Sequence, residues 1–256
     1  KLSNMQTLQQ TVKDGYAIVT LDRGKANPIN NQMVTELRQL MKENLENEAI
    51  GGVILTGKEN FFSAGLDVIE LMGYDEAKIK SFWQNFFDMI YELASFRKPL
   101  IASITGHSPA GGCVLAVCCD YRVMAEGKYT IGLNEIPVGI LVHESISALY
   151  ALWLGNRRAY QFLMEGKLMN VQEAHEYGLL DEVAAPDQVL AQAEAKMKHY
   201  LQFGRDVWQN SKLMLRKAVL EQVARDPEAK LEASLKQWKN PVTRKTLETM
   251  IARLKK

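Results

Sequence analysis

Short apolar segments that alternate with longer segments of helical periodicity constrain the fold of this chain more than any other feature. Residues 16–21, 52–57 and 100–104 are rich in aliphatic and β-branched side chains, and glycine, proline or aspartate lies beside each of them. The second and third are almost wholly apolar, which is typical of parallel strands buried on both faces. In the stretches that separate these three segments, apolar residues recur every three to four positions, as in an amphipathic helix. Repeated strand, helix and strand predict an α/β fold with a parallel sheet and crossover helices.

Helical periodicity predicts the other elements and a change of character after Pro186. In the first part we expect a strand at residues 121–124 and helices at residues 33–45, 82–93 and about 110–119. After Pro186 the spacing predicts only helices, through residues 189–201, 213–220 and 241–251. We therefore expect an α/β core at residues 1–186 and a C-terminal helical subdomain at residues 187–256.

Composition narrows the classes of partner. The chain has 256 residues, of which 47% are hydrophobic, so it is long and apolar enough for a sizeable buried core. Its formal net charge of +1 gives no global attraction to nucleic acid, and no apolar run reaches the roughly 18 residues of a membrane span. Three cysteines at 113, 118 and 119 share one apolar segment, which indicates small core residues in a reducing compartment. Zinc-type spacing is missing, so we expect no metal site.

Residues 108–135 carry the chemistry that we expect. Gly111 and Gly112 precede an apolar helix, so the Gly111 N–H would lie unpaired at a helix N-terminus, where negative charge is favoured. Glu135 has apolar neighbours in sequence, and burial there would raise the pKa of its carboxyl group toward the neutral range. The alternatives are a glycine pair that only permits a tight turn, and a carboxylate that is exposed or ion-paired.

Three motifs in order resemble one known family. They are Phe62-Ser63-Ala64-Gly65-Leu66-Asp67, the stretch from Ile104 through Ala110-Gly111-Gly112-Cys113 to Arg122, and Gly132-Leu133-Asn134-Glu135-Ile136 followed by Gly139. Together they resemble the crotonase (enoyl-CoA hydratase/isomerase) superfamily. The nearest likeness is to its mitochondrial-type 3,2-trans-enoyl-CoA isomerases. The resemblance implies a repeated ββα superhelix with a C-terminal helical subdomain that trimerises, and hence a homotrimer or a dimer of trimers.

The resemblance also implies roles for particular residues. The substrate would be an acyl-CoA thioester, and no further cofactor would be needed. The backbone N–H groups of Leu66 and Gly111 would bind the enolate oxygen, and Glu135 would move the proton. CoA binding would involve the loops at Lys25, Ala26, Ala64, Leu66, Asp67 and Gly111. The compartment would be the cytoplasm of a bacterium, or the mitochondrial matrix of a eukaryote after removal of a transit peptide.

Val114 and His143 bear on which reaction is catalysed. Hydratases of this superfamily carry a second glutamate at the position that matches Val114, and valine cannot bind the water that is added. We therefore expect an isomerase that shifts 3-enoyl-CoA to 2-trans-enoyl-CoA in fatty acid β-oxidation. A hydratase, another crotonase-type lyase on a specialised acyl-CoA, and a non-catalytic binder of CoA esters are the alternatives. His143, where a related branch carries aspartate, is either an accessory proton carrier or a hydrogen-bonded residue at a helix start.

Overall fold

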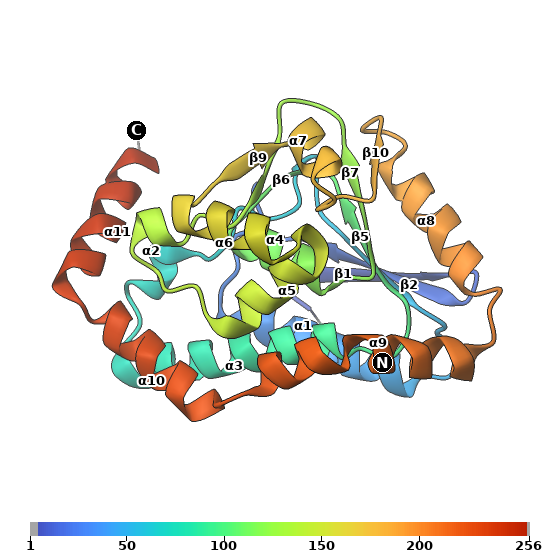
Figure 1. Cartoon of the computed structure of the whole chain (residues 1–256), viewed down its shortest axis with the longest axis horizontal. Helices are drawn as coiled ribbons and strands as arrows, with labels where there is room; N and C mark the ends of the chain where they lie inside the picture. The colour runs from blue at the N-terminus through green and yellow to red at the C-terminus, as the bar shows by residue number, and fades with distance from the viewer. Residues whose placement is uncertain (1–4, 255–256) are drawn as a thin grey trace.

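The computed structural model describes residues 5–254, which form two β-sheets and the helices around them (Figure 1). The larger sheet has six strands in the order β1-β2-β3-β5-β7-β10, and the smaller sheet has four in the order β4-β6-β8-β9. The strands of the larger sheet are β1 (Leu8–Lys13), β2 (Tyr16–Leu21), β3 (Val53–Thr56), β5 (Leu100–Ile104), β7 (Tyr121–Ala125) and β10 (Glu182–Ala184). Those of the smaller sheet are β4 (Asn60–Phe61), β6 (Gly106–Pro109), β8 (Thr130–Gly132) and β9 (Leu168–Asn170).

Parallel pairing dominates both sheets, and for the larger sheet the apolar runs at β3 and β5 predicted it. In the larger sheet only the β1–β2 hairpin is antiparallel, and Val53 of β3 lies opposite Leu100 of β5. In the smaller sheet β4, β6 and β8 are parallel, and β9 is antiparallel to β8. Parallel neighbours need a crossover connection, and helices supply it here.

The repeated unit consists of one strand in each sheet followed by helices. Strands β3 and β4 precede α2 and α3, strands β5 and β6 precede α4, and strands β7 and β8 precede the 3-10 turn η1 and α5. The elements are α2 (Val68–Leu71), α3 (Glu76–Ala94), α4 (Gly111–Cys118), η1 (Ile136–Val138) and α5 (Glu144–Leu154). This confirms the repeated ββα architecture. Because β4, β6 and β8 are parallel neighbours, the loops that leave their carboxyl ends lie together.

Helices cover both faces of the larger sheet. On one face α1 (Asn31–Glu46), α3 and α4 contribute to the main core. On the other face, Val189, Ala193 and Met197 of α8 (Val189–Tyr200) pack on a patch that includes Ile54 and Ile101. The helices between β8 and β10 are α5, α6 (Asn156–Glu165) and α7 (Val171–Glu176).

The last three helices pack on the body of the protein (Figure 1). Helix α9 (Arg205–Ala224) contacts α5 and α3, and α10 (Pro227–Trp238) contacts α3. Helix α11 (Pro241–Leu254) contacts both η1 and α2. The region after residue 186 is therefore helical, as expected, and the division of the chain at that residue stays a prediction. No helix within residues 5–254 is long and apolar enough to cross a membrane.

Candidate active site

Two of the loops at the carboxyl ends of the smaller sheet contact each other at glycine. Gly65 has φ +90°, and a methyl group placed on it would lie 3.1 Å from Ala110 Cβ and 3.2 Å from the Gly111 nitrogen. A methyl group on Gly111 would lie 3.4 Å from the Leu66 nitrogen. The chain can approach this closely only without side chains, so these glycines bring the Leu66 and Gly111 backbone nitrogens to one place.

Both of these N–H groups are free. Leu66 forms an isolated bridge with Ile29, in which Ile29 N–H donates to Gly65 O and Asp67 N–H donates to Ile29 O, each at 2.8 Å. The N–H of Leu66 itself therefore points away from Ile29. Gly111 is the first residue of α4, where an N–H has no partner within the helix. Neither N–H donates to any acceptor among residues 5–254. The pair can bind one anionic oxygen.

Side chains that the sequence analysis did not single out hold the Leu66 loop in place. Ser63 Oγ donates to Asn27 O at 2.8 Å and accepts from Gly65 N–H at 3.1 Å. Asn27 Nδ2 donates to Phe62 O at 3.1 Å. Arg23 forms ion pairs with Asp67 and Glu70, both at 2.7 Å. Polar residues in loops show no distinctive spacing, so only the contacts across more than 30 positions reveal these roles.

The turn before α4 is strained. Ala110 has φ 47° and ψ −119°, a region that residues with a Cβ rarely occupy, at a cost of about 1–3 kcal/mol. Its N–H donates to Gly132 O at 2.8 Å, which ties the turn to the end of β8. The strained conformation and this bond together fix the turn that leads into Gly111.

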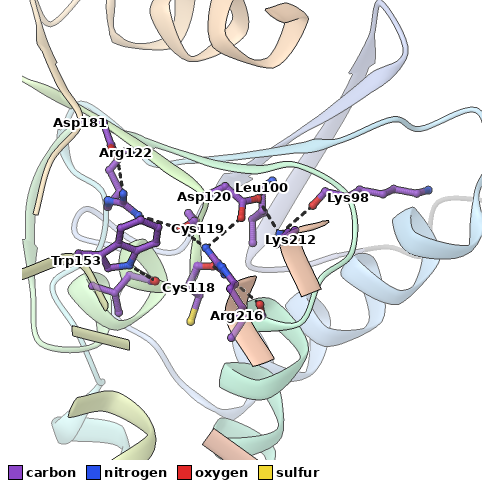
Figure 2. A network of polar contacts seen from close by, with 12 residues as sticks. Lys98, Leu100, Cys118, Cys119, Asp120, Arg122, Trp153, Asp181, Lys212 and Arg216 are labelled. Carbon is purple, nitrogen blue, oxygen red and sulfur yellow. Dashed lines mark hydrogen bonds and ion pairs between the residues drawn. The ribbon is translucent and has the colours of Figure 1, made fainter. Parts of the chain in front are cut away.

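A buried charge network anchors the other end of α4 (Figure 2). Arg216 of α9 donates to the carbonyls of Cys118 and Cys119 at 2.9 Å and pairs with Asp120 at 3.0 Å. Cations at a helix C-terminus complement its dipole. Lys212 also pairs with Asp120, at 2.7 Å. Arg122 Nη1 donates to Cys119 O and Trp153 Nε1 donates to Val117 O, each at 2.9 Å. Helix α4 is thereby held rigidly, with Gly111 at its free end.

Glu135 lies just after β8 and is almost fully buried. Its side chain is 6% exposed, and Oε2 has no hydrogen-bond partner among the described residues. Burial raises the pKa of Glu135 to about 7, against a small opposing effect of its own backbone N–H. Cys113 of α4 and Tyr150 of α5 are close enough that, after burial, the Glu135 charge raises their pKa values further. A carboxylate poised near neutral pH is suited to take and return a proton.

The other residues predicted for the site occupy different places. Ala64 is exposed, and its N–H donates to Ala26 O at 2.8 Å, so this bond joins the loop at Ala26 to the loop at Ala64. Asp67 caps α2 by accepting from Glu70 N–H at 2.9 Å and pairs with Arg23, and Lys25 is exposed. Their part in CoA binding stays a prediction.

His143 precedes α5 and is buried. Its Nε2 lies 2.8 Å from Ser234 Oγ of α10, and its ring packs edge-on against Phe87. Burial, with a smaller effect of Lys230, lowers the pKa of His143 to about 4, so the ring is neutral at pH 7. An accessory proton-carrying role stays a prediction, and the observed bond fastens the ring to α10. Glu144 starts α5 and pairs with Arg225 at 2.8 Å.

Comparisons with known proteins agree with this geometry. Residues 11–253 match the family described as enoyl-CoA hydratase/isomerase. The chain belongs to the enoyl-CoA hydratase/isomerase family. It is 37% identical over 236 residues to mouse mitochondrial enoyl-CoA delta isomerase 1, covering 91% of this chain and 81% of that protein. It is 31% identical to a probable enoyl-CoA hydratase of Rhizobium meliloti, covering 73% of this chain and 72% of that one.

A solved structure in this family matches nearly the whole chain. The crystal structure of human mitochondrial delta3-delta2-enoyl-CoA isomerase superposes with a TM-score of 0.94 at 28% identity, covering 98% of each chain. The crotonase fold and the likeness to the isomerase branch, expected from three motifs, are thus both confirmed.

Proposed function

We propose that this protein is an enoyl-CoA isomerase that converts 3-enoyl-CoA to 2-trans-enoyl-CoA in fatty acid β-oxidation. The observation that carries the proposal is a single buried carboxylate, Glu135, with a pKa of about 7 in a site that also offers two free N–H groups. Proton transfer beside a thioester needs a base of this kind together with donors for the enolate oxygen. The names of the mouse and human relatives support the same reaction.

The proposed reaction uses one proton twice. The Glu135 carboxylate takes a proton from C2 of the 3-enoyl thioester, and the C–H electron pair enters a dienolate that extends to the thioester oxygen. Leu66 and Gly111 N–H stabilise that oxygen, and removal of one such donor costs about 2.7–4 kcal/mol of transition-state stabilisation. Protonated Glu135 then returns the proton to C4, the C2–C3 double bond forms, and the carboxylate is restored. Atoms and charge balance without a metal or further cofactor.

Hydration is the second candidate, because several relatives are named as probable hydratases. Adding water to 2-enoyl-CoA calls for a group that binds and activates the water besides Glu135. Val114 lies on the first turn of α4, is 1% exposed and has no polar atom in its side chain. This position therefore supports isomerisation over hydration.

The assembly that we propose is a homotrimer or a dimer of trimers. Helix α9 carries Val207, Met214 and Leu215, whose side chains are 72%, 76% and 83% exposed. Apolar groups so exposed on one helix are typical of a surface covered by another subunit. The free, buried cysteines suit the reducing compartments that we propose, the bacterial cytoplasm or the mitochondrial matrix.

A paired assay tests the reaction. The purified protein is mixed with a 3-enoyl-CoA while the absorbance of the conjugated 2-enoyl thioester is followed, and hydration of 2-enoyl-CoA is measured in parallel. We expect rapid conjugation and little hydration. Hydration as fast as isomerisation would assign the protein to the hydratases. No reaction in either assay would contradict the proposal for this acyl chain.

The variant Glu135→Gln should lower isomerisation by about 10²–10⁴-fold, because the amide can neither take nor return the proton. Glu176→Gln serves as the control, since Glu176 is exposed on α7. Substantial activity in Glu135→Gln would show that another group carries the proton.

A further inference from the structure

Nothing polar among the described side chains holds the Glu135 carboxylate. Its Oε2 has no hydrogen-bond partner, and no described side chain bonds to its other oxygen. Catalytic groups usually owe their direction to hydrogen bonds from neighbouring side chains. Here the direction must come from the backbone, and therefore from whatever fixes the turn at residues 135–139.

The turn is closed by bonds to its first carbonyls. Val138 N–H and Ile140 N–H donate to Glu135 O at 3.1 and 3.0 Å, and Gly139 N–H donates to Ile136 O at 3.0 Å. Gly139 ends the turn with φ +79°, a left-handed conformation that favours glycine. Within residues 5–254, the carbonyl of Gly139 accepts hydrogen bonds only from residues outside the turn.

The turn is held between two helices that come from distant parts of the chain. On one side Pro137 lies against the end of α6, where a methyl group on Gly166 would come within 2.3 Å of Pro137 Cγ. On the other side, a methyl group on Gly139 would lie 3.3 Å from Thr243 Cα and 3.3 Å from Thr243 Oγ1. Contact this close transmits a displacement of α11 to the turn.

Two side chains of the C-terminal helices bind the Gly139 carbonyl. Thr243 Oγ1, at the start of α11, donates to Gly139 O at 3.0 Å and accepts from Gln237 Nε2 at 2.7 Å. Gln237, on α10, also donates to Gly139 O at 3.3 Å. Thr243 is 2% exposed, so these bonds are shielded from water. The bond between Ser234 and His143 fastens the following residues to α10 as well.

We propose that Thr243 and Gln237 are positioning residues for the reaction, which aim Glu135 by holding the Gly139 carbonyl. The inference rests on the proposed function, in which Glu135 moves the proton. The C-terminal helices then contribute to catalysis without touching the reacting atoms. The buried His143, through its bond to Ser234, is then a second point at which the segment after Glu135 is attached to α10.

The test is a set of three variants assayed for isomerisation. Thr243→Val keeps the shape of the side chain and removes both hydrogen bonds, and Thr243→Ser keeps the hydroxyl. Thr249→Val is the matched control on α11, because exposed Thr249 bonds only to Lys245 O of its own helix. A displacement near 1 Å at a reacting group can cost about 10²-fold. We expect kcat of Thr243→Val to fall by about 10–100-fold with little change in KM.

Two further readouts separate positioning from a loss of folding. Water that reaches a loosened Glu135 lowers its pKa, so the acidic limb of the pH–rate profile should move to lower pH in Thr243→Val. Thr243→Ser should restore most of kcat, and Thr249→Val should match the wild type. Thermal unfolding confirms that each variant is folded.

The inference is overturned if folded Thr243→Val has the kcat and pH profile of Thr249→Val while Glu135→Gln is inactive. A loss of kcat that serine does not restore would equally overturn it. If the wild-type protein itself fails to isomerise 3-enoyl-CoA, or Glu135→Gln remains active, the proposed function fails instead, and the two failures are distinguishable.

Discussion

At the scale of the residue, the burial that makes Glu135 a better base also opposes folding. An ordinary glutamate is ionised well below pH 7, whereas burial raises the pKa of Glu135 to about 7. Between pH 4.5 and 7 the folded protein therefore keeps a proton that the unfolded chain releases. Stability must fall as pH rises through this window, because the unfolded state binds fewer protons.

Glu135→Gln should remove this dependence on pH. The amide carries no charge to desolvate, so the variant should gain stability relative to the wild type as pH rises. From the shift of the pKa, the gain should grow by about 2 kcal/mol between pH 5.5 and 8.5. Urea unfolding at both values measures it, with Glu176→Gln as the control. An equal difference at both values would mean that Glu135 is not desolvated.

At the scale of the element, helix α9 differs from a simple amphipathic helix. Residues 213–220 lie within it as expected, but its buried residues are Lys212, Arg216 and Val223, while Ala218 is exposed. Burial lowers the pKa of Lys212 to about 8, and Asp120 partly offsets that effect (Figure 2). Arg216 donates to the carbonyls at the end of α4, and Lys212 pairs with Asp120 beside it, so both cations support the helix that begins at Gly111.

Asp120→Asn tests that network. The substitution leaves Lys212 and Arg216 buried beside each other without their common anion, which should cost about 3–5 kcal/mol of unfolding free energy. Denaturant unfolding measures the loss, and Asp187→Asn, at an exposed position, is the control. Equal stability of the two variants would mean that the ion pairs contribute nothing.

At the scale of the whole molecule, an apolar hollow lies apart from the residues of the candidate active site. A cavity of about 640 Å³ is bounded by α9 and the end of α5, with Leu152, Phe203, Val207, Trp208 and Leu215 among its lining residues. Asp120, Lys212 and Arg216 reach the same cavity, so the surface proposed as a subunit interface directly adjoins the network that holds α4.

Leu215→Asp should disrupt the proposed trimer, because it places a charge where a neighbouring subunit would bury an apolar side chain. Light scattering after size-exclusion chromatography should show a shift from trimer to monomer. Val12→Asp is the control, since Val12 is 60% exposed on β1. A wild-type protein that runs as a monomer would contradict the assembly, and a trimer that survives the substitution would place the interface elsewhere.

Much of the fold and part of the site could be predicted from sequence because their signals are local. The strands at residues 16–21 and 100–104 coincide with β2 and β5, and the helix expected at about 110–119 is α4. The apolar neighbours of Glu135 predicted its raised pKa correctly. The strands of the smaller sheet were missed, because two to four residues are too few to show a period.

By itself, the sequence determined the α/β class and the family, and it named Leu66, Gly111 and Glu135 as candidate site residues, since periodicity and motifs are properties of neighbouring residues. Only the tertiary structure decided what surrounds them. The bond between Thr243 and Gly139 joins residues 104 positions apart, and that between Arg216 and Cys118 joins residues 98 apart. Such contacts depend on how the sheets bring distant segments together, and a threonine or an arginine in a helix looks the same in sequence whether or not it makes one.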